Sequence, residues 1–128
     1  MKLLLDTHIF LWYITADARL PVLFRDTIRE PKNEVFLSVV SLWETIIKYK
    51  LGKLPLPQSP EIYIPHERRR HQIKTLSLHE NVIKELANLP ALHRDPFDRV
   101  MICSAIANNL TIVTVDAQIQ SYNVSYLK

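Results

Sequence analysis

The chain has very little glycine and very little cysteine. Gly52 is the only glycine among 128 residues, so the sequence cannot contain a P-loop, a G-x-G-x-x-G fingerprint or a G-x-S-x-G nucleophile elbow. The corresponding nucleotide-cofactor enzymes and α/β-hydrolases are therefore excluded. Cys103 is the only cysteine, which rules out an intramolecular disulfide. This usage favours a reducing compartment, and we expect a cytoplasmic protein.

Long apolar runs are also missing. No run approaches the roughly 18 residues that a membrane-spanning helix needs. The first apolar stretch contains Asp6 and His8, which a secretory signal would not tolerate. We therefore expect no membrane partner. The formal net charge is +3 and the pI is about 9.1, which suits an anionic partner such as nucleic acid without requiring one.

Strand-like apolar runs alternate with helical segments along the chain. Strands are predicted at residues 2–5, 34–39, 73–76 and 111–115, with a fifth at the sheet edge at 124–127. Helices are predicted from residue 7 and at 21–30, 41–51, 61–72, 77–86 and 96–109. The chain is 48% apolar and has no repeat or linker. It is therefore predicted to form one α/β domain over residues 1–128, with a mostly parallel sheet of four to five strands.

Acidic side chains stand where the predicted strands give way to helices. Asp6 follows the first strand, Glu44 lies one turn beyond the second, Asp98 opens the longest helix and Asp116 ends the fourth strand. In a parallel sheet these positions share one edge. Carboxylates gathered there repel one another by roughly 4 kcal/mol per pair at about 4 Å and an effective dielectric of about 20. A divalent cation would turn this cost into a binding site, so the pattern predicts a metal-dependent enzyme.

Each of these acids also has a structural explanation. Residues 41–44 and 77–80 fit capping boxes, and residues 95–98 fit a helix start with an aspartate cap and proline at the first position. Asp6 and Asp116 could each cap the helix that follows. For any single acid, capping is favoured over catalysis by roughly three to one.

The order of the strands decides which acids meet. If strands one to three run outward and strand four returns beside strand one, the switch point lies between strands one and four. Asp6 and Asp116 would then flank the crevice, with Glu44 one strand away. Glu80 would lie two strands away, roughly 10 Å at about 4.8 Å per strand, so we interpret it as a cap. The connection before the longest helix is long enough to bring Asp98 to the same edge.

Four sequence blocks occur in order along nearly the whole chain. They are Leu4–Trp12 (LLDTHIFLW), Ser38–Glu44 (SVVSLWE), His93–Arg99 (HRDPFDR) and Thr114–Asp116 (TVD). These blocks resemble the signature blocks of PIN-domain ribonucleases, and within that family most resemble the VapC toxins of bacterial toxin–antitoxin pairs. The resemblance implies a three-layer α/β/α sandwich, Mg²⁺ or Mn²⁺ held by acidic residues, and endoribonuclease activity neutralised by a small antitoxin.

Carried over position by position, the resemblance makes Asp6, Glu44, Asp98 and Asp116 the catalytic and metal-binding carboxylates. Asp95 fits an extra acid of the toxin subgroup and could be a helix cap or an outer-shell ligand. Members of the family commonly form homodimers and reach promoter DNA through the antitoxin. A homodimer and indirect DNA contact are expected here on that ground alone.

Oxygen ligands favour a hard ion, Mg²⁺ or Mn²⁺, over zinc. Such an ion would polarise the phosphodiester and lower the pKa of a bound water. Asp6 and Asp98 are expected to contact the principal ion, with Glu44 and Asp116 binding directly, through water or through a second ion. Glu44 is the most plausible group to orient or deprotonate the attacking water.

Basic and aromatic residues supply further candidates. Arg94 and Arg99 flank the acids and are expected to contact substrate or antitoxin, although Arg99 could instead pair with a neighbouring acid. The basic run at residues 68–70 is interpreted as a solvated helix surface, with RNA phosphate contact as the alternative. Trp43 is expected first of all in the core, with a groove for the antitoxin as the alternative. Val115 stands where family members often carry arginine or lysine, which affects substrate grip more than metal binding.

A non-enzymatic function is the main alternative. The chain could be a catalytically inactive PIN-like module that binds only RNA or a protein. Four intact acids argue against this, because unused carboxylates would cost stability without a cation. An aspartate-based phosphatase or phospho-acceptor domain is disfavoured, since His8 stands where that class needs a second aspartate.

Overall fold

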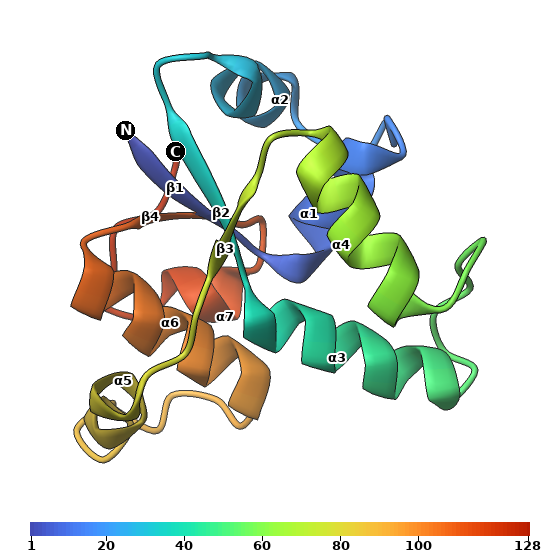
Figure 1. Ribbon diagram of the computed structural model, residues 1–128. Helices are drawn as coiled ribbons and strands as arrows, with labels where there is room; N and C mark the ends of the chain where they lie inside the picture. Colours follow the sequence, from blue (N-terminus) through green and yellow to red (C-terminus); the bar gives the residue numbers. More distant parts are fainter.

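Four parallel strands form the sheet of this protein, in the order β3-β2-β1-β4 (Figure 1). The computed structural model describes residues 1–128. The strands are β1 (Lys2–Leu5), β2 (Glu34–Ser38), β3 (Lys74–Leu76) and β4 (Thr111–Val113). The fourth strand lies beside the first, so the condition under which the acids were expected to meet is fulfilled. A fifth strand at 124–127 is not formed, because this segment makes only a single parallel bridge, between Tyr126 and Ile112.

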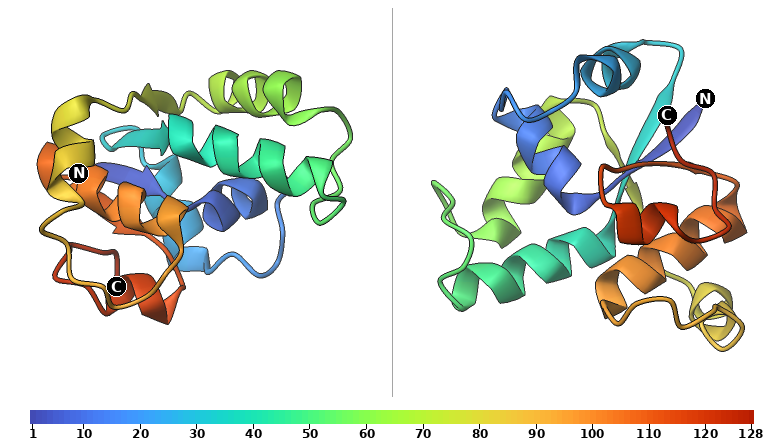
Figure 2. Two further views of the ribbon diagram at one scale, coloured as in Figure 1. Left: turned by 90° about the horizontal axis from the view of Figure 1, so that it is seen from below. Right: turned by 180° about the vertical axis from the view of Figure 1, so that it is seen from behind.

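Helices follow every strand and cover both faces of the sheet (Figures 1 and 2). They are α1 (Thr7–Ile14), α2 (Val22–Arg29), α3 (Val39–Lys50), α4 (Pro60–Arg70), α5 (Glu80–Glu85), α6 (Pro96–Asn108) and α7 (Ala117–Gln120). None of these helices combines the length and the apolar character needed to cross a membrane.

Strand β1 lies between two separate apolar cores. Leu3 and Leu5 belong to the core that includes side chains of α1, α2 and α4. Leu4 belongs to the core that includes side chains of α6 and α7. All three leucines have 0% exposure. Successive side chains of a strand point to opposite faces, so burial on both faces requires the continuous apolar run seen in the sequence.

Helix α3 begins earlier than predicted. Ser38 is its N-cap, and the Ser38 side chain accepts a hydrogen bond of 3.1 Å from the backbone N–H of Val40. The predicted capping box at residues 41–44 is therefore wrong. Ser41 and Glu44 instead lie inside the helix, and both are buried. Gly52 follows the end of the helix, and its φ of 71° suits a residue without a side chain.

The starts of the other helices show which of the predicted helix caps are formed. Asp95 caps α6 and Asp116 caps α7, each through its side chain, as their sequence context predicts. The capping box predicted at residues 77–80 is wrong, because α5 begins after His79 and has no side-chain cap bond. The exposed Glu80 is simply the first residue of this short helix.

Candidate active site

Acidic residues from three parts of the chain meet at the carboxyl edge of the sheet. Asp6 follows β1 and precedes α1, Glu44 lies in the second turn of α3, and Asp95 and Asp98 stand at the start of α6. The charges of Asp95, Asp6 and Glu44 all act on the Asp98 carboxyl and contribute to a raised pKa. The structure therefore brings these four acids into one electrostatic cluster. Figure 1 shows that α3 and α6, which carry three of the acids at or near their first turns, both begin below the sheet.

Asp6 is held by the strand that lies beside it. Its backbone N–H donates to the carbonyl of Val113 (3.0 Å), and its carboxylate Oδ2 accepts from the hydroxyl of Thr114 (2.8 Å). Asp6 is only 8% exposed and Thr114 is 0% exposed. Burial raises the pKa of Asp6; the Thr114 hydrogen bond opposes this shift, and the nearby charge of Glu44 adds to it. Asp6 is thus a carboxylate whose charge is poorly solvated.

Glu44 has partners on both of its carboxylate oxygens. Oε1 accepts from the hydroxyl of Thr7 (2.8 Å), which also lies 2.9 Å from Ser41 Oγ. Oε2 accepts from the ammonium of Lys48 (2.5 Å), one helical turn further along α3. Burial of Ser41 and Glu44 against α1 explains why α3 must start before Ser41. A Ser41 side chain used as a cap could not also face Thr7.

Asp98 has the most strongly shifted titration in the site. Burial, partly opposed by a hydrogen bond from His93 and reinforced by the charges of Asp95, Asp6 and Glu44, raises the pKa of Asp98 to about 6. His93 Nε2 lies 3.1 Å from Asp98 Oδ2, and the His93 side chain is only 5% exposed. His93 is thus a buried side chain that is hydrogen-bonded to an acid of the cluster.

Tyr122 fixes the orientation of His93. The Tyr122 hydroxyl accepts from the backbone N–H of His93 (3.2 Å) and from Arg99 Nη1 (3.0 Å), and it lies 2.7 Å from His93 Nδ1. With two donors pointing at its oxygen, the hydroxyl gives its own proton to Nδ1. His93 then carries its ring proton on Nε2 and donates it to Asp98. A C-terminal tyrosine therefore orients a carboxylate at the start of α6.

Arg99 holds the loop that precedes α6. Its guanidinium donates to the backbone carbonyls of Pro90 (2.8 Å) and Leu89 (3.3 Å) as well as to Tyr122. It makes no ion pair with an acid, so that alternative is wrong. Arg94 is exposed, and its side chain has neither a hydrogen bond nor an ion pair within the chain. Of the two arginines that flank the acids, Arg99 therefore has partners within the chain and Arg94 has none.

Asp116 is connected to the other acids only indirectly. Its carboxylate accepts from the backbone N–H of Gln118 (2.9 Å), and its own N–H donates to Thr114 Oγ1 (3.0 Å). The Thr114 hydroxyl in turn donates to Asp6. The charge of Asp116 is not among those that shift the pKa of Asp6 or Asp98. The structure thus groups Asp6, Glu44, Asp95 and Asp98, and two hydrogen bonds through Thr114 connect Asp116 to Asp6.

The donor set has the right chemistry for a hard divalent ion. All the acids offer oxygen ligands, and neither Asp6 Oδ1 nor Asp98 Oδ1 accepts a hydrogen bond. In the side-chain positions of the structure, however, no three acidic, histidine or cysteine side chains are close enough to share an ion. Both oxygens of Glu44 are already occupied by Thr7 and Lys48. The oxygen donors thus suit a hard divalent ion in their chemistry, but in these positions they do not form a site for one.

An aromatic pair joins the two helices at this edge. Trp43 on α3 and Phe97 on α6 pack edge to face, with ring centroids 5.0 Å apart and an interplanar angle of 84°. Each directly precedes an acid of the cluster, Glu44 and Asp98 respectively. Trp43 is 56% exposed, so the expectation that it lies in the core is wrong. The pair stabilises the approach of α3 to α6 and so keeps Glu44 near Asp98.

Four polar residues of the site were not identified from the sequence as parts of it. Thr7 and Thr114 lie close in sequence to acids of the site, and Lys48 lies four residues after Glu44. Tyr122 lies 29 residues after His93 and 23 residues after Arg99, the residues that its hydroxyl contacts. The helical spacing of Glu44 and Lys48 is a recognisable signal for an ion pair. The role of Tyr122 has no local signal, because it depends on how the C-terminal segment packs against the loop before α6.

The chain belongs to the PIN domain family, whose model matches residues 3–124. The chain is similar to Ribonuclease VapC16 of Mycobacterium tuberculosis, with 39% identity over 54 residues. That match covers 42% of this chain and only 38% of the relative.

Solved structures with the same fold cover nearly the whole chain. One is VapBC2 of Rickettsia felis bound to a DNA fragment from its promoter, with a TM-score of 0.74, 17% identity, and coverage of 99% of this chain and 98% of that chain. Another is VapBC-1 of nontypeable Haemophilus influenzae, with a TM-score of 0.67, 18% identity, and coverage of 100% and 98%. At these identities the likeness shows the fold, and the predicted PIN-like α/β architecture is confirmed.

Proposed function

We propose that this protein is an endoribonuclease dependent on Mg²⁺ or Mn²⁺ that acts as the toxin of a toxin–antitoxin pair. The observation that carries the proposal is the cluster of the buried Asp6 and Glu44 with the partly buried Asp98 at the carboxyl edge of a PIN-domain sheet. Such a cluster is costly for a protein that does not use it. The similarity to Ribonuclease VapC16 over 54 residues supports RNA as the substrate.

Asp6 and Asp98 would hold the ion through their unbonded oxygens, with Glu44 and Asp116 completing the site directly or through water. Asp95, which caps α6, would act from the outer shell. The bound ion would supply a polarised phosphodiester oxygen and a more acidic water. The site would hold one or two ions.

The remaining residues position the carboxylates for the reaction. Thr114 bonds one oxygen of Asp6 and Thr7 bonds one oxygen of Glu44, which limits the orientations that each carboxylate can adopt. His93 does the same for Asp98. Glu44 is the group that orients the attacking water or accepts its proton.

Arg94 is the better of the two arginines for contact with an RNA phosphate or with the antitoxin, because its side chain has no partner within the chain. Arg99 we assign to positioning of the loop before α6. The basic run on α4 is partly engaged, since Arg68 donates to the Ile73 carbonyl and Arg70 pairs with Glu67. This engagement supports its interpretation as a helix surface.

The partners follow from the same proposal. Several similar structures are VapBC complexes, and one of them is bound to promoter DNA. We propose that this chain likewise binds a small cognate antitoxin, forms a homodimer, and contacts DNA only through the antitoxin. We further propose that it acts in the cytoplasm.

The test is cleavage of total bacterial RNA by the purified protein with and without Mg²⁺, followed by sequencing of the new RNA ends. Asp98→Asn is expected to lose at least about 100-fold in cleavage rate while remaining folded. Asp26→Asn, at an exposed acid on α2, is the matched control and should leave the rate unchanged. Cleavage retained by Asp98→Asn would reject the assignment. An inactive binding module would instead bind RNA without cleaving it and take up no Mn²⁺ in a calorimetric titration.

A further inference from the structure

A lysine lies inside the carboxylate cluster. Lys48 stands one turn after Glu44 on α3, and its Nζ lies 2.5 Å from Glu44 Oε2. The Glu44 side chain is 7% exposed and that of Lys48 is 35% exposed, so the ammonium reaches inward from the surface. The charges of Asp95 and Asp98 also act on Lys48. The ammonium is therefore paired directly with Glu44 and is also influenced by the charges of two further acids of the candidate site.

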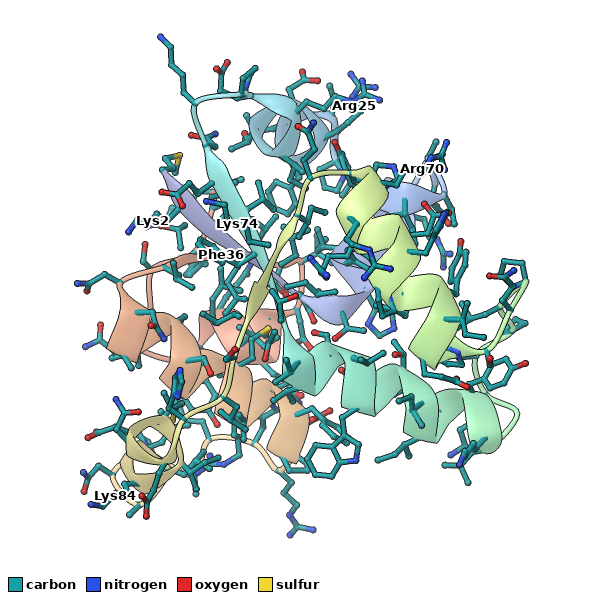
Figure 3. The ribbon with its side chains drawn as sticks, viewed as in Figure 1. Lys2, Arg25, Phe36, Arg70, Lys74 and Lys84 are labelled. Atoms are coloured by element: carbon teal, nitrogen blue, oxygen red, sulfur yellow. The ribbon has the colours of Figure 1, made fainter.

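No other lysine of the chain is placed in this way. Lys2 and Lys74 begin β1 and β3, at the opposite edge of the sheet, where Lys74 pairs with Glu34 at 2.9 Å. Figure 3 shows Lys74 together with Arg25 and Arg70 on that side of the molecule. Lys50, two residues after Lys48 on the same helix, is exposed and has no ion pair. The position of Lys48 is thus specific to the acidic cluster.

The Glu44–Lys48 pair is more buried than an ordinary ion pair on the surface of a helix. Lysine and glutamate four residues apart on a solvated helix surface contribute little, because both charges remain hydrated. Here the glutamate is buried, and its second oxygen is already bound to Thr7. Without the ammonium, Oε2 of a buried carboxylate would be left without a partner next to other acids, which is unfavourable.

The same oxygen is needed when a divalent ion binds through Glu44. An ammonium and a dication cannot share Oε2 at contact distance without strong repulsion. We propose that Lys48 is the resident counter-ion of the metal-free site, holding Glu44 until a divalent ion binds and then releasing Oε2. Lys48 is therefore a positioning residue that competes with the metal. This inference rests on the proposed metal dependence.

The experiment compares Mn²⁺ binding by metal-free wild-type protein and two lysine variants, using titration calorimetry. Lys48→Met removes the charge and keeps the length of the side chain, and Lys50→Met is the matched control on the same helix. Lys48→Met is expected to bind Mn²⁺ on the order of tenfold more tightly, because a competing like charge is removed. Lys50→Met should bind like the wild type.

Thermal unfolding gives a second readout that does not depend on activity. Without metal, Lys48→Met should melt at a lower temperature than the wild type, and added Mn²⁺ should raise its melting temperature by more than it raises that of the wild type. Lys48→Arg retains the positive charge and should restore both the higher metal-free melting temperature and the weaker Mn²⁺ binding. It keeps the inference testable if Lys48→Met does not fold.

The outcomes separate this inference from the proposed function. Equal or weaker Mn²⁺ binding by Lys48→Met would overturn the role of Lys48 while leaving the metal site intact. Binding by Lys48→Met but not by the wild type would support the competition in its strongest form. If none of the proteins took up Mn²⁺, the metal dependence and the inference would both fall.

Discussion

Replacing Asp98 by asparagine should make the metal-free protein more stable at neutral pH. The pKa of Asp98 is raised from 3.8 to about 6 by burial and neighbouring charges. Folding therefore disfavours the ionised form, and at pH 7 the carboxyl is ionised in both the folded and the unfolded state. Each pKa unit is worth about 1.36 kcal/mol, so a shift from 3.8 to about 6 sets a ceiling of about 3 kcal/mol on the gain.

The gain should disappear in acid. As the pH falls from about 6 toward 3.8, the folded wild-type protein binds the proton first, and the stability of the wild type approaches that of the variant. At pH 4 the difference should be under about 1 kcal/mol. The asparagine Oδ1 can still accept from His93, so the orientation of the side chain is retained.

Urea unfolding at pH 7 and pH 4, followed by tryptophan fluorescence, measures this difference directly. The free energy of unfolding of Asp98→Asn is expected to exceed that of the wild type by about 1 to 3 kcal/mol at pH 7. The Asp26→Asn control should differ by less than about 0.5 kcal/mol. A loss of stability in Asp98→Asn at pH 7, or a gain of the same size at both pH values, would refute the reasoning.

Three further changes test the fold and the support of the site. Thr114→Val should lower the free energy of unfolding by about 2 kcal/mol in urea, because the buried Asp6 loses its donor, and Thr114→Ser should recover most of it. Tyr122→Phe should reduce RNA cleavage about tenfold, since His93 loses its orienting partner, and should lower the free energy of unfolding by about 1 to 2 kcal/mol, since a buried hydroxyl with three partners is removed; unchanged cleavage would contradict this. Ile112→Ala, at 0% exposure, should cost about 3 kcal/mol by calorimetry, and a loss below about 1 kcal/mol would show that the core relaxes.

The arrangement of the sheet could be predicted from the sequence because its signals are long and redundant. The run Leu3-Leu4-Leu5 admits no strand with one face in water, so β1 had to be central. A fourth strand beside the first is one arrangement that the rules for parallel α/β connections allow, and in a parallel sheet Asp6 and Glu44 then share one edge. The type and order of the helices and strands can therefore be predicted from the apolar patterns of one sequence.

The start of α3 could not be predicted in the same way. Both Ser38 and Ser41 are good helix caps by residue type, and a local pattern does not choose between them. The choice is made by tertiary contacts, since Ser41 packs against Thr7 on α1. The same limit applies to the partners of the acids: Lys48 and Tyr122 acquire their roles only when separate elements meet.

The hydroxyl of Thr114 bridges the two ends of the chain, since it donates to Asp6 at a separation of 108 residues and accepts from the N–H of Asp116. During synthesis on the ribosome, Asp6 therefore emerges long before the group that secures it. A growing chain cannot assemble this centre until β4 has docked beside β1. Catalytic competence would then be a property that this domain acquires only after its last strand has been translated.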